Sequence, residues 1–201
     1  MADSDRERLR RMLQERSFIT GTFKLSSGQT SSYFFDGKQV VLDPAGAHLA
    51  GNAVLELIRE RAPEANAVAG PTVGADPIVT AAMLLSAGTD QPLAGLFVRS
   101  ERKDHGTERI IEGPMERGMR VVIVDDAATT GGSLVHTTRC LREAGLDLEV
   151  VLAIALVDRL AGYEAAMDEI GVPAASVFTL DDFTPPEAAS DPLSLDGRGS
   201  G

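Results

Sequence analysis

The chain has 201 residues, of which 43% are hydrophobic and 24% are charged, and its formal net charge is -11 at pH 7. This length suits one globular core, and the acidic balance argues against nucleic acid as a partner, because phosphate binding needs a basic surface. No run approaches the roughly 20 uncharged apolar residues of a membrane span, and the charged opening MADSDRERLRRMLQER is unlike a signal peptide. We therefore expect a cytoplasmic protein that does not enter a membrane.

The first predicted elements are a helix and a hairpin. The helix spans residues 4–15, where apolar residues recur at helical spacing, and the hairpin spans residues 23–35, where apolar and small polar residues alternate. Together they predict a small N-terminal hood over about residues 1–40. Asp43 and Pro44 then supply an N-cap and a first-turn proline for a helix over residues 44–61.

Beyond that helix, short β-branched runs alternate with helical patterns. Strands are expected over 67–69, 93–98, 120–124, 148–157 and 176–180, and helices over 77–85, 132–144 and 161–170. This alternation predicts an α/β fold with a mainly parallel twisted sheet and helices on both faces. We expect one domain over residues 1–184 and a disordered tail over residues 185–201, which are rich in proline, glycine and serine. Cys140, the only cysteine, falls on an apolar helix position, which favours a packed core thiol.

The segment VVIVDDAATTGGS, residues 121–133, joins an apolar strand to a polar turn and a helix. In a doubly wound sheet, ligands bind beyond the carboxyl ends of the strands, and Asp125 and Asp126 stand at such an end. The turn from Thr129 to Ser133 offers backbone N–H groups and hydroxyls, which favour an anion such as a phosphate. The two carboxylates would repel a phosphate and instead suit ribose hydroxyls, with a divalent metal nearby to balance charge. Each part alone is an ordinary strand exit or helix cap, but their contiguity indicates a site.

A second polar segment, RSERKDHGTER at residues 99–109, holds four of the chain's 19 Lys and Arg residues. Its three acidic residues nearly balance them, so on charge alone a solvated loop is as good an interpretation as a binding loop. The sequence has no G-x-x-x-x-G-K-[ST] and no G-x-G-x-x-G. The nucleoside triphosphatase and dinucleotide-binding interpretations therefore lose their main support.

The segment VVIVDDAATTGGS, residues 121–133, resembles the phosphoribosyl diphosphate (PRPP) binding signature of type I phosphoribosyltransferases. Three further segments are similar to orotate phosphoribosyltransferases: FKLSSGQTSSYFFD at 23–36, FVRSERKDHG at 97–106 and LVDR at 156–159. The resemblance covers about residues 5–180 and implies the type I phosphoribosyltransferase fold. It also implies a pentosyltransferase of pyrimidine (UMP) biosynthesis, in which orotate attacks C1 of PRPP with Mg²⁺ present, giving orotidine 5′-monophosphate and pyrophosphate.

The family pattern implies a role for each matching residue. The implied catalytic residues are Asp125, Asp126, Arg99, Lys103 and His105, of which the last three would close as a lid over the pyrophosphate, from the partner subunit of a homodimer with shared active sites. The implied PRPP site comprises these residues together with Ala127, Ala128, Thr129, Thr130, Gly131, Gly132 and Ser133. The implied orotate site comprises Arg159, which would meet the carboxylate, with Thr129, Ser26, Phe34 and Phe35. Mg²⁺ would be held mainly through PRPP, with no firm protein ligand.

Some residues also have a structural interpretation. Phe34 and Phe35 suit a core as well as a ligand site, and Asp158 with Arg159 could form a local ion pair. His48 and His136 lie on predicted helices and suit structural roles. GPTVGADP at 70–77 resembles the family's pyrophosphate loop, although alone it indicates only a turn.

The chain departs from the family pattern at three positions. Many orotate enzymes carry lysines where this chain has Ser26, Val73 and Ser100. Lys24, Arg102 and the backbone amides of residues 70–76 are the candidate replacements.

Two other functions stay open. One is a purine phosphoribosyltransferase, which the hairpin and Arg159 disfavour. The other is a non-catalytic regulator that senses PRPP or a nucleotide on the same fold. Such regulators usually add a DNA-binding module, for which the 22 residues before Phe23 and a pI near 4.7 leave neither space nor charge.

Overall fold

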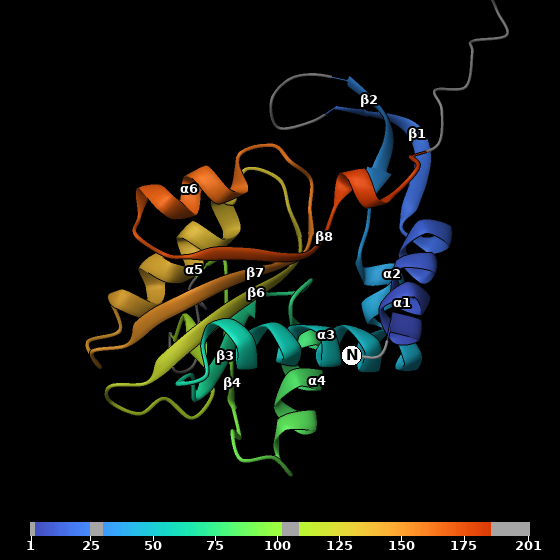
Figure 1. Ribbon diagram of the computed structural model, residues 1–201. Coiled ribbons are helices and arrows are strands. Elements are labelled where there is room, and N and C mark those ends of the chain that lie inside the picture. Colours follow the sequence, from blue (N-terminus) through green and yellow to red (C-terminus); the bar gives the residue numbers. More distant parts are fainter. Residues whose placement is uncertain (1–2, 25–29, 102–108, 186–201) are drawn as a thin grey trace, which may run out of the picture.

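The protein contains a six-stranded sheet and a separate hairpin (Figure 1), seen in a computed structural model that describes residues 3–24, 30–101 and 109–185. The large sheet has the order β5-β4-β3-β6-β7-β8, and β1 pairs with β2 in the hairpin. The strands are β1 (Phe18–Lys24), β2 (Thr30–Phe35), β3 (Ala67–Pro71), β4 (Ala94–Val98), β5 (Ile111–Glu112), β6 (Arg120–Ala128), β7 (Glu149–Asp158) and β8 (Ala174–Thr179). All neighbours in the large sheet are parallel except β4 and β5. The expected mainly parallel sheet is confirmed.

Helices cover both faces of this sheet, as predicted (Figure 1). One face carries α3 (Pro44–Arg61) and α4 (Asp76–Ser86), and the other carries α5 (Gly132–Arg142) and α6 (Tyr163–Glu169). Side chains alternate along β6, so that Val122 and Val124 join the first core whereas Val121 and Ile123 join the second. Because both faces are buried, the strand is a continuous apolar run. None of the helices in the described part of the chain is long and apolar enough to cross a bilayer.

The bounds of α3 follow directly from local sequence signals. The Asp43 carboxylate accepts hydrogen bonds from the backbone N–H groups of Ala45 and Gly46 at 2.9 and 3.2 Å, and Pro44 occupies the first turn. The helix therefore has the bounds that the sequence predicts. By contrast, α2 (Lys38–Val41) and β5 are four and two residues long. Such short elements carry too little periodicity to be predicted.

One boundary error affects the site. The strand expected over 120–124 continues as β6 to Ala128, so Asp125 and Asp126 lie within the strand and not after it. The cause is pairing with β7, which extends to Ala128 opposite Asp158 and stabilises the backbone of the polar residues. This tertiary contact has no local sequence signal.

An aromatic cluster fixes the N-terminal hood to the body of the protein. The hood contains α1 (Asp3–Arg16) and the β1–β2 hairpin. The Phe18 ring lies 5.2 Å from the Phe35 ring and 5.8 Å from the Phe183 ring, and Phe183 in turn lies 5.7 Å from Phe178 of β8. A short 3-10 helix, η1 (Leu180–Asp182), joins β8 to Phe183. The predicted tail falls outside the described residues, apart from Pro185.

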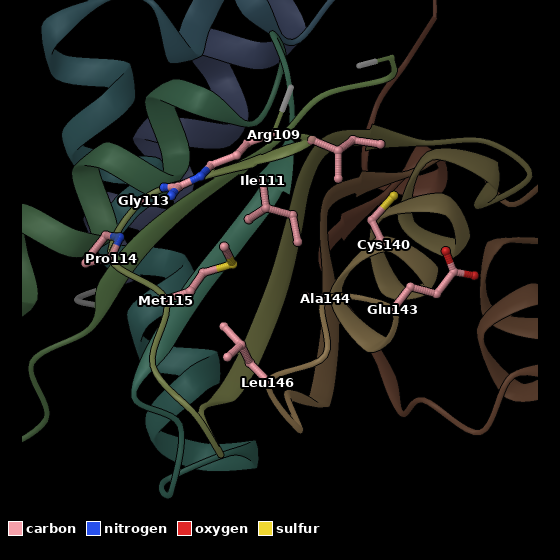
Figure 2. Close-up of a pocket in the computed structure, with 10 residues that line it drawn as sticks. Arg109, Ile111, Gly113, Pro114, Met115, Cys140, Glu143, Ala144 and Leu146 are labelled. Carbon is pink, nitrogen blue, oxygen red and sulfur yellow. The ribbon is translucent and has the colours of Figure 1, made fainter. Parts of the chain in front are cut away.

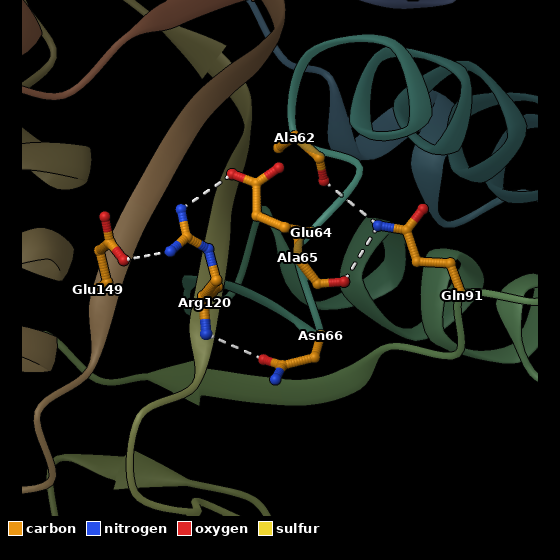
Figure 3. Close-up of polar contacts among 7 residues, drawn as sticks. All are labelled: Ala62, Glu64, Ala65, Asn66, Gln91, Arg120 and Glu149. Atoms are coloured by element: carbon orange, nitrogen blue, oxygen red, sulfur yellow. Dashed lines mark hydrogen bonds and ion pairs between the residues drawn. The ribbon is translucent and has the colours of Figure 1, made fainter.

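Polar contacts join the amino ends of β6 and β7 to the loop before β3 (Figure 3). The Arg120 guanidinium donates to Glu64 at 3.0 Å and pairs with Glu149 at 2.8 Å, and the Arg120 backbone N–H donates to Asn66 Oδ1 at 2.9 Å. Gln91 donates to two backbone carbonyls of the same loop. These side chains link the amino ends of the strands. The polar part of VVIVDDAATTGGS lies at the carboxyl ends, on the opposite side of the sheet.

Candidate active site

β3 and β6 stop pairing before β6 ends, which leaves an opening in the sheet at the carboxyl ends of these strands. β3 pairs with β6 only as far as Ala69 and Ile123, whereas β6 pairs with β7 as far as Ala128 and Asp158. Within the described part of the chain, the second half of β6 therefore has no strand neighbour on its β3 side. The chain also continues in opposite directions from here, to β4 on one side and to β7 on the other. Open α/β sheets bind ligands at this kind of switch point.

Two buried carboxylates, which we call the acid pair, line this opening. Asp125 and Asp126 are 6% and 8% exposed. The Asp125 carboxylate accepts a hydrogen bond of 2.7 Å from Ser133 Oγ in the first turn of α5. Asp126 packs against Gly37 and Gly74, since a Cβ atom on Gly37 would lie 2.7 Å from Asp126 Oδ2 and one on Gly74 would approach Oδ1 more closely still. Both glycines therefore leave the space that the Asp126 carboxylate fills.

Burial sets the electrostatics of the acid pair. Burial raises the pKa of Asp125 to about 7, and the negative charge of Asp126 adds to this effect while the hydrogen bond from Ser133 opposes it. Burial also raises the pKa of Asp126, and the Lys38 ammonium opposes that rise. Carboxylates in such a poorly solvated place are strong acceptors for hydroxyl groups and stabilise a positive charge that develops nearby.

A tight turn connects β6 to α5. Gly131 has a φ of 78°, and a Cβ atom there would lie 3.3 Å from Tyr163 Cα and from Ala166 Cβ of α6. On Gly132, by contrast, a Cβ atom would meet nothing nearer than 3.8 Å. The first turn of α5 carries no acidic residue. Its open backbone N–H groups and the helix dipole suit an anion.

Arg159 follows β7 directly and lies beside this turn. Its backbone N–H donates to Ala128 O at 2.8 Å, and its Nη1 donates to Thr129 Oγ1 at 3.5 Å. The Arg159 Nε atom is buried and has no hydrogen-bond partner in the described ranges. A buried unpaired donor is costly, so this guanidinium suits a carboxylate ligand. The Asp158 carboxylate instead accepts from Leu160 N at 2.8 Å, and no ion pair between Asp158 and Arg159 is found in the described residues.

The ends of β3 and β4 complete this edge of the sheet. Thr72 N donates to Val98 O at 2.9 Å, the Thr72–Val73 peptide bond is cis, and Val73 is 63% exposed. Arg99 follows β4, and its Nε donates to Glu112 Oε1 at 3.3 Å. Burial raises the pKa of Asp76, the first residue of α4, and the positive charge of Arg99 opposes this. The predicted site residues Ser26, Lys103 and His105, and the candidate cation Arg102, lie outside the described residues.

The two phenylalanines of β2 do not share an environment. Phe35 is 3% exposed and packs against Phe18, so its ring belongs to the core. Phe34 is 38% exposed and lies 5.7 Å from the Phe23 ring. Neighbouring strand residues point to opposite faces, so the Phe34 and Phe35 rings lie on opposite faces of β2. The core interpretation holds for Phe35.

Sequence reasoning missed Gly37 and Lys38. Lys38 Nζ lies 2.5 Å from Asp36 Oδ1, and the pKa of Lys38 is raised by the negative charges of Asp36, Asp126 and Asp125. A single lysine in a four-residue helix gives no local signal. The dipeptide Asp36-Gly37 directly after the hairpin indicates only a turn.

Other parts of the structure lack these features. A hollow of about 600 Å³ lies between the β5 segment and the second half of α5, where the side chains of Ile111, Met115 and Leu146 border one space (Figure 2). It contains none of the strand-end residues described above. Over residues 3–24, 30–101 and 109–185, no cluster of three or more His, Cys, Asp or Glu side chains could hold a metal ion. Cys140 is buried on α5, as predicted.

We expect Asp125→Asn to stabilise the unliganded protein above neutral pH. The pKa of Asp125 is about 7 in the fold, against an ordinary value of 3.8, so the folded chain binds this proton more tightly than the unfolded chain. Stability is therefore lost as the pH rises through about 7, and asparagine avoids the loss because it cannot ionise. The variant should melt about 2–4 °C above the wild type at pH 8. At pH 5 the gain should be smaller. An equal difference at both pH values, measured by calorimetry, would contradict the proposed ionisation.

The comparisons with known proteins agree on one family. Residues 39–175 match the model of the phosphoribosyl transferase domain. A protein of Thermosynechococcus vestitus named orotate phosphoribosyltransferase is 44% identical over 179 residues, covering 89% of this chain and 92% of the relative. A protein of Nostoc sp. with the same name is 42% identical over 179 residues, covering 89% and 84%. The crystal structure of Mycobacterium tuberculosis H37Rv orotate phosphoribosyltransferase in complex with PRPP has a TM-score of 0.71 and 29% identity, over 89% of this chain and 98% of that one.

Proposed function

Because this chain belongs to the phosphoribosyltransferase family, we propose that it transfers the ribose 5-phosphate group of PRPP to orotate. The products are orotidine 5′-monophosphate and pyrophosphate. One observation carries this proposal. β6 and β7 end in register, with Ala128 opposite Asp158, so the acid pair, the turn into α5 and the unpaired Arg159 donor lie at one edge of the sheet.

The geometry supports a role for each group of residues at this edge. The turn from Thr129 to Ser133 binds the 5′-phosphate through backbone N–H groups at the start of α5. Asp125 and Asp126 accept hydrogen bonds from the ribose hydroxyls, and their charges stabilise the oxocarbenium-like transition state at C1. Arg159, which lies beside Thr129, binds the orotate carboxylate. This contact orients the orotate so that its ring nitrogen lies near C1.

The leaving pyrophosphate needs positive charge and hydrogen-bond donors. We propose that the backbone amides of Val73 and Gly74 and the side chains of Arg99, Lys103 and His105 supply them. Mg²⁺, when bound with PRPP, neutralises part of the pyrophosphate charge. It fits this site through PRPP and not through a protein cage, because the described residues offer two buried carboxylates at the opening and no cluster of three metal ligands. Omitting Mg²⁺ should abolish turnover, and full activity in a metal chelator would contradict this.

Assembly, domain bounds and location are further parts of the proposal. We propose a homodimer in which the lid serves the partner subunit's site, so a monomer in sedimentation under assay conditions would contradict it.

Residues 1–184 form one domain including the hood, which is supported by the contacts of Phe18 and Phe35 with Phe183; cooperative melting in one transition tests this. We also propose a cytoplasmic location, which suits a chain whose single cysteine, Cys140, excludes an intramolecular disulfide; cell fractionation tests this. We further expect no binding of nucleic acid or membranes.

Arg159→Ala should raise the KM for orotate at least tenfold more than the KM for PRPP, on the scale of one lost charge-assisted contact. The reason is that the guanidinium meets only the orotate carboxylate. The measurement is steady-state turnover with each substrate varied in turn. Arg142→Ala is the matched control. Arg142 is the last residue of α5 and donates to Ile170 O, away from the carboxyl ends of the strands where the site lies. Equal rises in both KM values would reject the assignment of Arg159.

Base specificity is tested on the wild-type protein. Loss of orotate absorbance should require both PRPP and Mg²⁺, and adenine, guanine, hypoxanthine and uracil should not replace orotate. Turnover of a purine without turnover of orotate would favour the purine phosphoribosyltransferase alternative. Binding of PRPP without turnover of any base would favour a sensing protein.

A further inference from the structure

We propose that Lys38 is a positioning residue for the acid pair, and that its ammonium group keeps Asp126 in the charged form that the ribose hydroxyls and the transition state need. This inference rests on the proposed function and deepens it. Lys38 is the first residue of α2, between the hairpin and α3, and lies outside every segment that the sequence pattern predicts for the site.

The backbone around Lys38 packs directly on Asp126. Gly37 precedes Lys38, and a Cβ atom on Gly37 would lie 2.7 Å from Asp126 Oδ2 and 3.0 Å from Asp126 Cβ. Only a residue without a side chain allows this approach. Lys38 therefore follows a residue whose backbone contacts the carboxylate.

Asp36 fixes the position of the ammonium group. Its carboxylate lies 2.5 Å from Lys38 Nζ, and it also accepts from the backbone N–H of Lys38 at 3.2 Å and from Gln39 Nε2 at 3.1 Å. The backbone of Asp36 is in turn held by Ser17, because Asp36 N donates to Ser17 O at 2.8 Å. The lysine is thus fixed from both its main chain and its side chain.

The charges around Asp126 make this ammonium necessary. Three charged side chains act on Asp126 electrostatically, namely the carboxylates of Asp125 and Asp36 and the ammonium of Lys38. Asp76, the first residue of α4, follows two residues after Gly74, which packs on Asp126. Burial and the negative charge of Asp36 raise the pKa of Asp126, whereas the positive charge of Lys38, and after it hydrogen bonding to Asp125, lowers it. Lys38 itself remains charged, because the same carboxylates raise its pKa. Without Lys38, Asp126 would take up a proton at a higher pH and would lose its negative charge beside C1.

The test is the pH profile of kcat/KM for PRPP, which reports ionisations of the free enzyme. In Lys38→Met, the acidic limb of the profile should move upward by about one pH unit, the shift typical of losing one nearby opposite charge. Below that limb, kcat/KM should fall about tenfold relative to the wild type. Lys38→Arg should keep the limb close to its wild-type position, because it restores the cation. Lys38→Gln provides a second neutral variant should the methionine variant fold poorly.

Arg120→Met is the matched control. It removes a cation that pairs with two carboxylates at the amino end of the same strand, β6, and its limb should not move. If both neutral variants of Lys38 keep the wild-type limb, or lose activity equally at all pH values, the inference is overturned while the proposed function stands. If the wild-type protein turns over no orotate with PRPP, the proposed function fails and this inference fails with it.

Discussion

Asp126→Asn should lower kcat/KM by about 10²-fold while the protein remains folded. Asparagine keeps the shape of the side chain and removes the negative charge. Because Asp126 is 8% exposed, little water can replace that charge when positive charge develops at C1. The substitution therefore removes an interaction that is stronger in the transition state than in the bound substrate.

Steady-state orotate turnover measures this effect, and Asp147→Asn is the control. Asp147 pairs with Arg117 at the surface, where its side chain is 73% exposed, and its φ of 52° suits asparagine. The control variant should keep its activity, because it removes the same charge far from the acid pair. A loss below about threefold in Asp126→Asn would remove Asp126 from the site.

Gly74→Ala should also lower activity, by up to about 10²-fold, the cost of a displacement of about 1 Å at a reacting site. The new Cβ atom would overlap Asp126 Oδ1, and Asp126 is already confined by Gly37 on another side. The carboxylate or the loop must therefore move. Neither movement requires the sheet to unfold.

The control for this substitution is Gly88→Ala. Gly88 follows α4, and a Cβ atom there would meet nothing within 4 Å. Thermal melting of both variants should show two folded proteins, and kinetics should show that only the Gly74 variant is impaired. Wild-type kcat/KM in a folded Gly74→Ala protein would mean that the Asp126 carboxylate need not occupy its observed position.

Local signals predicted the parts of the fold that depend on neighbouring residues. Asp43 and Pro44 mark the start of α3, and alternating β-branched and helical segments indicate the parallel sheet. The end of β6 was placed too early, because its last residues are held by β7 and not by their own propensity. Strand pairing of this kind depends on residues that are distant in sequence.

The site was predictable to the extent that its residues are contiguous. Asp125, Asp126 and the turn that follows form one run, which a single strand end explains. Phe34 and Phe35 suit a ligand site or a core on sequence alone, and the alternation of β2 directs the Phe35 ring into the core. Lys38 could not be found, because only the packing of Gly37 on Asp126 brings it to the acid pair.

A crystal structure of the protein with orotidine 5′-monophosphate would test most directly whether the ends of β6 and β7 form one site for both halves of the product. We expect the phosphate at the turn from Thr129 to Ser133, the ribose hydroxyls at Asp125 and Asp126, and the carboxylate at Arg159. Density that places the phosphate away from this turn, or the carboxylate away from Arg159, would contradict the proposed site.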